Sequence, residues 1–274
     1  MRWSELALLL LLGSATVVGG PVPESGGRVT EPVGQAPEPG RQAPELAWKP
    51  ERPRQGQLFL VRVGGLEERA EVGGEVAGEP LHFVSLSDGS RVSLAPVPVD
   101  VEGSLRLEVS VERPDGRRES LGASVPVAPG GFVHERLTVA PRFGSPPDSA
   151  DRARLARDRE LARQVSLQAR RTPPLWSDTV IVPRDDRVTS GFGSGRVFNG
   201  QVSSRHMGLD LDGETGDPVV AATRGVVALV DSFLLAGNVV YLNHGGGLVS
   251  GYFHLSEALV SQGDTVEAGT PVGR

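Results

Sequence analysis

The chain has 274 residues, a formal net charge of −6, no cysteine, 36 glycines and 22 prolines. The acidic balance disfavours a nucleic-acid binder with a strongly basic surface. The absence of cysteine excludes disulfides, Cys-ligated zinc, iron–sulfur clusters, a thiol nucleophile and a lipidated N-terminal cysteine. The length allows one large domain or two smaller ones, and the glycine and proline content predicts many turns and short strands.

Residues 1–20 have the pattern of a secretory signal peptide. Arg2 precedes the apolar run Leu6–Leu12, and small residues follow from Gly13 to Gly20. The apolar stretch is shorter than the ~20 residues that span a bilayer, although an uncleaved membrane anchor is the competing interpretation. We therefore expect export to the periplasm or cell envelope.

Residues 21–46 predict a proline-rich linker, because they carry six prolines and little apolar surface. Residues 47–140 change to short, alternating apolar runs, which predict an antiparallel β-sandwich. The runs are Leu58–Val63, Leu81–Leu86, Arg91–Leu94, Leu105–Val111 and Ala123–Val127. Turn signals stand between them at Gly73-Gly74, Asp88-Gly89 and Pro114-Asp115-Gly116. No motif here carries chemistry, and His82 and His134 are interpreted as structural.

Residues 141–176 predict a helical connector. Asp148 or Ser149 can cap a helix, and neither Gly nor Pro follows until Pro173. The apolar stripe of this helix is thin, so we expect it to pack lightly between the domains, with binding of a partner or blocking of a groove as the alternative. Residues 177–274 return to short strands without helical periodicity, which predicts an all-β domain.

Two clusters in this second domain could carry chemistry. The first runs from Ser190 through His206 to Asp210, and histidine and aspartate are both ligands of catalytic zinc. On a straight strand these two residues would lie ~13 Å apart, so Gly208 must bend the backbone or the side chains must lean together. By itself, the His-x-x-x-Asp spacing is a weak signal.

The second cluster covers residues 243–255. Three glycines between two apolar runs predict a hairpin turn after His244, and counting back along the ladder places His254 opposite Asn238. The two histidines would then be ~20 Å apart, so at most one belongs to the reaction centre. Period-two alternation would place Tyr252 and His254 on one face, where an acid–base pair could form.

The order of these motifs resembles the lysostaphin-type, or LytM-like, zinc endopeptidases that cut peptidoglycan cross-bridges. The matching segments extend over about 85 residues. They are Phe192-Gly193, Arg196, His206–Asp210, Gly216–Val219, Ala221-Ala222, Gly225-Val226, Gly237–Val240, His244-Gly245, Tyr252–Leu255, Gly263–Val266, Gly269 and Val272-Gly273. The sandwich before them looks like the immunoglobulin-like amino-terminal domain that many envelope members carry.

The resemblance implies a mostly β protein with an immunoglobulin-like sandwich, a helical connector and a lysostaphin-type antiparallel β-domain. It makes His206 and Asp210 zinc ligands and His254 a catalytic histidine, with Arg196 and Tyr252 lining the substrate groove. The implied substrate is the peptide cross-links of peptidoglycan, and an envelope protein could act as a regulator. The alternative is a non-catalytic member that binds cell wall or activates another hydrolase.

The family completes its site with a carboxy-terminal His-x-His, which the sequence does not contain before Arg274. We therefore expect residues 1–274, as a truncated domain, to bind zinc weakly and to leave peptidoglycan uncut, since a catalytic zinc normally has three protein ligands. A lipoyl- or biotin-carrier domain is excluded because it needs a lysine to modify, and no lysine follows Lys49.

Overall fold

The protein is described by a computed structural model, which covers residues 27–29, 43–138, 147–176, 180–198 and 202–274. The chain divides into two compact units, Met1–Gly131 and Phe132–Arg274. The predicted signal segment lies outside the described residues. Within the described ranges, none of the helical structure is long and apolar enough to cross a membrane.

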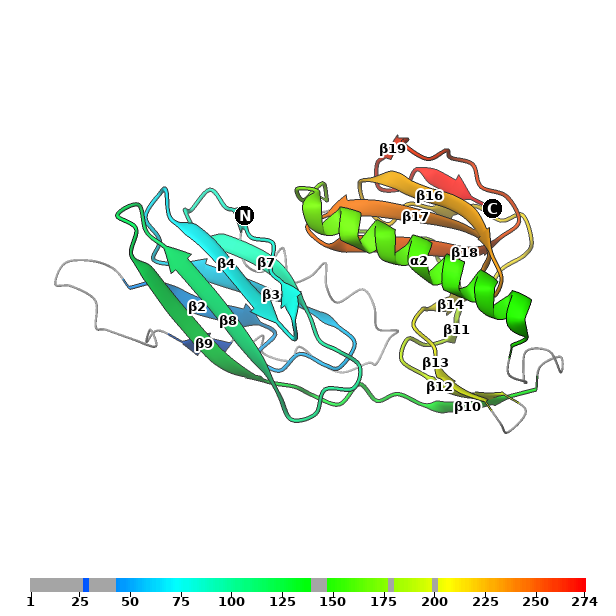
Figure 1. Ribbon diagram of the computed structural model, residues 1–274, viewed down its shortest axis with the longest axis horizontal. Helices are drawn as coiled ribbons and strands as arrows, with labels where there is room; N and C mark the ends of the chain where they lie inside the picture. Colours follow the sequence, from blue (N-terminus) through cyan, green and yellow to red (C-terminus); the bar gives the residue numbers. More distant parts are fainter. Residues whose placement is uncertain (1–26, 30–42, 139–146, 177–179, 199–201) are drawn as a thin grey trace. The chain divides into compact units, whose positions relative to one another are not determined.

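The described part of the first unit consists of two antiparallel sheets (Figure 1). One sheet has the order β1-β2-β3-β7-β6 and the other the order β5-β4-β8-β9. The strands of the first sheet are β1 (Gly27–Val29), β2 (Glu45–Lys49), β3 (Leu58–Gly64), β6 (Val84–Ser85) and β7 (Arg91–Pro96). Those of the second are β4 (Glu71–Val76), β5 (Glu79–Pro80), β8 (Ser104–Glu112) and β9 (Arg118–Pro126). Alternating residues of both sheets, such as Phe59 and Leu107, form one fully buried core.

Two predictions in this unit are wrong in detail. Gly73 and Gly74 do not form a turn but lie inside β4, opposite Ser110 and Val109. A Cβ on Gly74 would lie 2.5 Å from the backbone oxygen of Glu108, so glycine here allows close strand approach. The segment expected to be a linker contributes β1, which pairs with β2 as an edge strand, because even a proline-rich segment can add a short strand at a sheet edge.

The boundary between the units also differs from the prediction. His134–Leu137, which the sequence pattern assigns to the sandwich, forms β10 and pairs in parallel with β12 of the second unit. The alternation of this segment is genuine, but a period-two pattern does not say which sheet a strand joins.

Where the structure describes it, the second unit is β-rich apart from one long helix (Figure 1). Four strands form the sheet β18-β17-β16-β19, and the others form small ribbons: β10-β12-β13, β11-β14 and β15-β20. The sheet strands are β16 (Gly225–Phe233), β17 (Gly237–Gly245), β18 (Leu248–Leu255) and β19 (Thr265–Val266). The ribbon strands are β11 (Val188–Ser190), β12 (Gly195–Phe198), β13 (Val202–Arg205), β14 (Asp210–Leu211), β15 (Val219–Val220) and β20 (Pro271–Gly273). The apolar run Thr179–Val182 also has the pattern of a strand, but its described residues, 180–182, form none.

Helix α2 (Ser149–Arg171) crosses the strands β16, β17 and β18 in Figure 1. Asp148 caps it by accepting a hydrogen bond from the Asp151 backbone, as the sequence predicts. Although the sequence suggests a connector between domains, α2 contacts the strands β16, β17 and β18 of the second unit, and it buries only Asp158, Val165 and Ala169. The apolar stripe of α2 is thin, and polar contacts add to its attachment to the sheet.

These polar contacts hold α2 at both ends of the sheet. In the first half of the helix, Arg157 pairs with Asp231, and Asp158 accepts a hydrogen bond from the Leu234 backbone. At its end, the backbone amide of Gly247 donates to Ala169, and that of Gly246 donates to Thr172. The helix is therefore attached to the turn after β16 and to the turn after β17.

His244 is part of a buried polar chain in this unit. The hairpin turn lies directly after it, since Gly245 pairs with Leu248. Its Nδ1 contacts the Arg224 carbonyl oxygen at 2.8 Å, and because that oxygen can only accept, Nδ1 donates. Nε2 of the neutral ring then accepts from the Ser250 hydroxyl at 2.7 Å. His244 therefore has a structural role in holding the hairpin.

This arrangement predicts acid sensitivity. Burial lowers the pKa of His244 below its ordinary value of 6.5, which outweighs the opposing effect of the bond to Arg224. The unfolded chain thus binds more protons, so the stability contribution is complete above pH 6.5 and is lost as the pH falls through the folded-state pKa. Urea unfolding between pH 8 and pH 5 should show a steeper loss for the parent than for His244→Gln, whose side chain cannot titrate. Equal slopes for the two proteins would contradict this assignment.

Candidate metal centre

His206 and Asp210 lie at the two ends of a short bend between β13 and β14. The backbone of His206 is fixed by two hydrogen bonds of 2.7 Å, one to the Ser194 carbonyl and one from the Gly193 amide. Beyond it, the chain bends at Gly208, which lies below the imidazole: a Cβ there would be 3.4 Å from Nε2 of His206. The bend shortens the separation that a straight strand would impose.

The two side chains face each other. Nε2 of His206 lies 3.0 Å from Oδ1 of Asp210, and the exposed fractions of the side chains are 11% and 45%. The prediction that they approach a common point agrees with this distance. Nδ1 of His206 lies 3.2 Å from the Gly191 carbonyl oxygen, which can only accept, so Nδ1 donates there; in the neutral tautomer with this bond the lone pair is on Nε2.

This donor set fits a divalent metal ion. A lone pair on Nε2 directed at a carboxylate oxygen is repulsive unless a proton or a cation lies between them. A histidine that donates its other ring N–H to a backbone carbonyl is the usual arrangement of a metal-ligating imidazole. Neutral imidazole and carboxylate are also ligands that Zn²⁺ accepts. Among the residues that the structure describes, no group of three His, Asp or Glu side chains gathers as a complete metal site.

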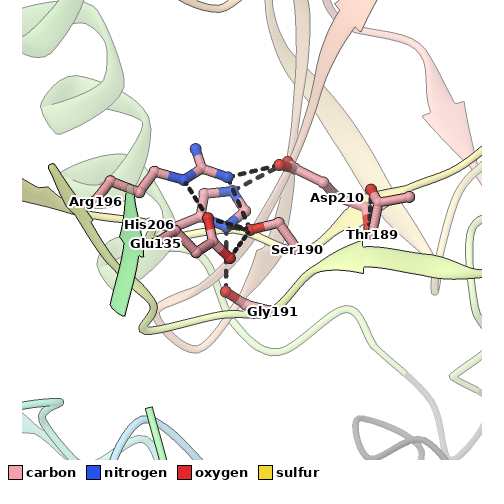
Figure 2. A network of polar contacts seen from close by, with 7 residues as sticks. All are labelled: Glu135, Thr189, Ser190, Gly191, Arg196, His206 and Asp210. Atoms are coloured by element: carbon pink, nitrogen blue, oxygen red, sulfur yellow. Dashed lines mark hydrogen bonds and ion pairs between the residues drawn. The ribbon is translucent and has the colours of Figure 1, made fainter. Parts of the chain in front are cut away.

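Arg196, on β12, holds the other oxygen of Asp210. Its Nη2 donates to Oδ2 of Asp210 at 2.7 Å and to the Ser190 hydroxyl at 2.9 Å (Figure 2). Its Nε donates to Glu135 at 3.3 Å. Arg196 was expected in a substrate groove, and in the structure its guanidinium is engaged by the side chains of the centre itself.

Glu135 and Ser190 complete the network in Figure 2. The Ser190 hydroxyl lies 2.9 and 3.2 Å from the two carboxylate oxygens of Glu135 and 3.2 Å from Nδ1 of His206. Sequence reasoning missed both residues. Ser190 is the first residue of the cluster that the sequence analysis identifies, but no role was expected for its hydroxyl. Glu135 is 71 residues from His206 in sequence, and only the pairing of β10 with β12 brings it near.

The remaining predicted residues lie on β18. Tyr252 is 5% exposed, and its hydroxyl accepts from the Ala222 backbone at 2.8 Å, so the ring belongs to the core. His254 is exposed and has a φ of 56°, a left-handed conformation that is strained in a residue other than glycine. The prediction that the two share a face is wrong, because a bulge opposite Val239 breaks the alternation and pairs Asn238 with Leu255.

A comparison with known protein families finds a match to the carboxy-terminal part of the chain. Residues 204–274, which include His206, Asp210 and His254, match the model of peptidase family M23. This part of the chain is therefore similar to the M23 peptidase domain. The match includes β14 to β20 and the two candidate ligands, whereas Ser190, Arg196 and Glu135 precede it.

Two curated relatives match about a third of the chain. The peptidoglycan DD-endopeptidase ShyC of Vibrio cholerae is 35% identical over 89 residues, which are 32% of this chain and 20% of the relative. The peptidoglycan DD-endopeptidase ShyA of the same organism is 34% identical over 90 residues, with the same coverage. The chain therefore spans about a fifth of the length of these relatives.

One solved structure covers more of the chain. A crystal structure of a candidate peptidase M23 from Pseudomonas aeruginosa matches with a TM-score of 0.55 and 22% identity, over 81% of each chain. At this identity the likeness supports the mostly β fold and nothing finer.

Proposed function

We propose that this protein is a zinc metalloendopeptidase that hydrolyses peptide cross-links of peptidoglycan. The observation that carries the proposal is the His206–Asp210 pair, whose Nε2 and Oδ1 atoms face each other at 3.0 Å inside the M23 domain. The names of the two Vibrio relatives supply the substrate class.

In this proposal His206 and Asp210 hold the metal. The hydrogen bond to Gly191 keeps the lone pair of His206 on Nε2, and Arg196 turns Asp210 so that Oδ1 remains available. Zinc held there would supply Lewis acidity toward the scissile carbonyl and toward water. A catalytic zinc normally has three protein ligands, and in the family that this chain resembles the third comes from a His-x-His element.

His254 is the proposed catalytic histidine. Its side chain is exposed on β18 within the M23 match, and its strained backbone is of a kind that concentrates at functional sites. An imidazole can transfer a proton or stabilise the developing charge on oxygen. Tyr252, by contrast, is fully engaged in the core, so the groove role expected for it has no support in its position.

A cell-envelope location accords with the substrate. The relatives include the two peptidoglycan endopeptidases and an outer membrane antigenic lipoprotein B of Histophilus somni, 29% identical over 111 residues. The signal-peptide pattern of residues 1–20 points to the same compartment.

Release of muropeptides from isolated peptidoglycan tests this function. Because the family's third ligand belongs to a His-x-His element, the assay compares residues 1–274 alone with the same residues followed by that segment. We expect hydrolysis from the second form, with a loss on the order of 100-fold or more in kcat when His254→Ala removes the proton-transfer group. Zinc binding should be unchanged in that variant.

The non-catalytic alternative makes a different prediction. A wall-binding or hydrolase-activating member would bind peptidoglycan equally well with and without His254, and it would release no muropeptide in either form. That result would contradict the proposed peptidase.

A further inference from the structure

We infer that Glu135 is a positioning residue for the metal centre, acting through Arg196 and Ser190. The inference rests on the proposed zinc site and extends it to β10, a strand outside the residues that match the M23 family. Glu135 touches neither candidate ligand in the interactions drawn in Figure 2, so its effect must pass through its neighbours.

The first path runs through Arg196. This guanidinium lies between two carboxylates, with Nε on Glu135 and Nη2 on Asp210. The Arg196 and Glu135 side chains are 20% and 23% exposed, so their attraction is less screened by water than that of a surface pair. Glu135 therefore fixes the direction from which Arg196 reaches Oδ2 of Asp210, and this leaves Oδ1 facing His206.

The second path runs through Ser190. Its hydroxyl has one proton, and the carboxylate of Glu135 is the strongest acceptor around it, at 2.9 Å. If the proton points to Glu135, the Ser190 oxygen accepts from Arg196 and from Nδ1–H of His206. Glu135 thereby favours the His206 tautomer whose Nε2 can bind a metal ion.

The negative charge of Glu135 is a third reason to expect that this residue strengthens zinc binding. Glu135 offsets the positive charge of Arg196, which lies beside the proposed cation site. Replacing Glu135 with a neutral residue would leave that charge directed at Asp210 alone, where it competes with a metal ion for the carboxylate. Misplaced ligands and uncompensated charge would both weaken zinc binding.

The backbone fixes Glu135 in this place. β10 pairs with β12 so that Glu135 is the register partner of Arg196. Two glycines allow the close contact: a Cβ on Gly195 would lie 2.4 Å from the His134 ring, and one on Gly193 would lie 2.2 Å from the Phe132 ring. The segment from Phe132 to Glu135 thus packs closely against the turn that supports His206. This close packing holds Glu135 beside the metal centre.

The test measures zinc affinity of the full chain by competition with a chromophoric chelator. Glu135→Gln should weaken zinc binding by ~10-fold, a typical effect of losing a group that orients a metal ligand. In an Arg196→Gln background the same substitution should cost less affinity than it does in the parent, because the path through Arg196 is already broken and only the path through Ser190 remains. Glu160→Gln is the matched control, since Glu160 also pairs with an arginine, on the exposed surface of α2.

Several outcomes would overturn the inference. One is an affinity of Glu135→Gln within twofold of the parent, and another is an undiminished loss in the Arg196→Gln background. If Glu135→Gln lowers the unfolding temperature, the zinc affinity of Glu135→Asp is compared with that of the parent instead. This variant keeps the charge and should recover most of the affinity.

A measurement without metal separates this inference from the proposed function. Equal zinc binding by the parent and by His206→Ala would refute the metal site itself. Crystal structures of the metal-free parent and of Glu135→Gln would then decide the positioning role. We expect the Arg196 guanidinium of the variant to change its position against the Asp210 carboxylate, and an unchanged arrangement of Arg196, Asp210 and His206 would contradict the role of Glu135.

Discussion

Replacing His206 with alanine should reduce zinc affinity by on the order of 100-fold or more, since it removes a metal ligand and not only a group that orients one. The variant removes one of the two facing donors, and a single carboxylate, still bound by Arg196, cannot hold the ion alone. Asp210→Ala should have a comparable effect. Isothermal titration or competition with a chelator measures both.

The control for this result is His82→Ala, which removes a histidine from the first unit. We expect its zinc affinity to equal that of the parent. A loss in His82→Ala as large as that in His206→Ala would mean that zinc binds elsewhere, and the assignment of the metal centre would be wrong.

Gly245→Ala should cause the largest loss of stability in the second unit, about 3 kcal/mol or more. Gly245 is buried with a φ of 72°, and a Cβ there would lie 1.9 Å from the carbonyl oxygen of Pro173. Backbone strain and a collision with backbone therefore act together. Urea unfolding followed by circular dichroism measures the change.

Gly263→Ala separates these two causes. Gly263 also has a positive φ, of 97°, but a Cβ there meets nothing within 4 Å. We expect it to cost about 1–3 kcal/mol from strain alone. If the two substitutions are equally destabilising, the contact with Pro173 contributes nothing.

Local patterns in the sequence predict much of this fold. Alternation identifies most of the long strands, and Asp148 with the Gly- and Pro-free stretch after it identifies α2. These features depend on neighbours in sequence. The placement of α2 on the sheet, and of β10 beside β12, depends on contacts between distant residues, which no local period encodes.

The candidate site divides in the same way. His206 and Asp210 are four residues apart, so motif order and one bend are enough to bring them together. Glu135 could not be found, because a lone glutamate in a short strand has no distinguishing pattern. The bulge at β18 was missed as well: nothing in the letters Tyr252-Phe-His254 marks an interrupted alternation, and the exposure of His254 depends on it.

The attachment of α2 to both turns of the sheet bears on how the part of the chain that matches the M23 family can be isolated. A fragment limited to residues 204–274 would lack this helix and β10. The strands β16, β17 and β18, which α2 contacts, would lose the covering that this helix provides. Such a fragment invites aggregation through the uncovered face, and soluble, crystallisable material should require a start before Phe132.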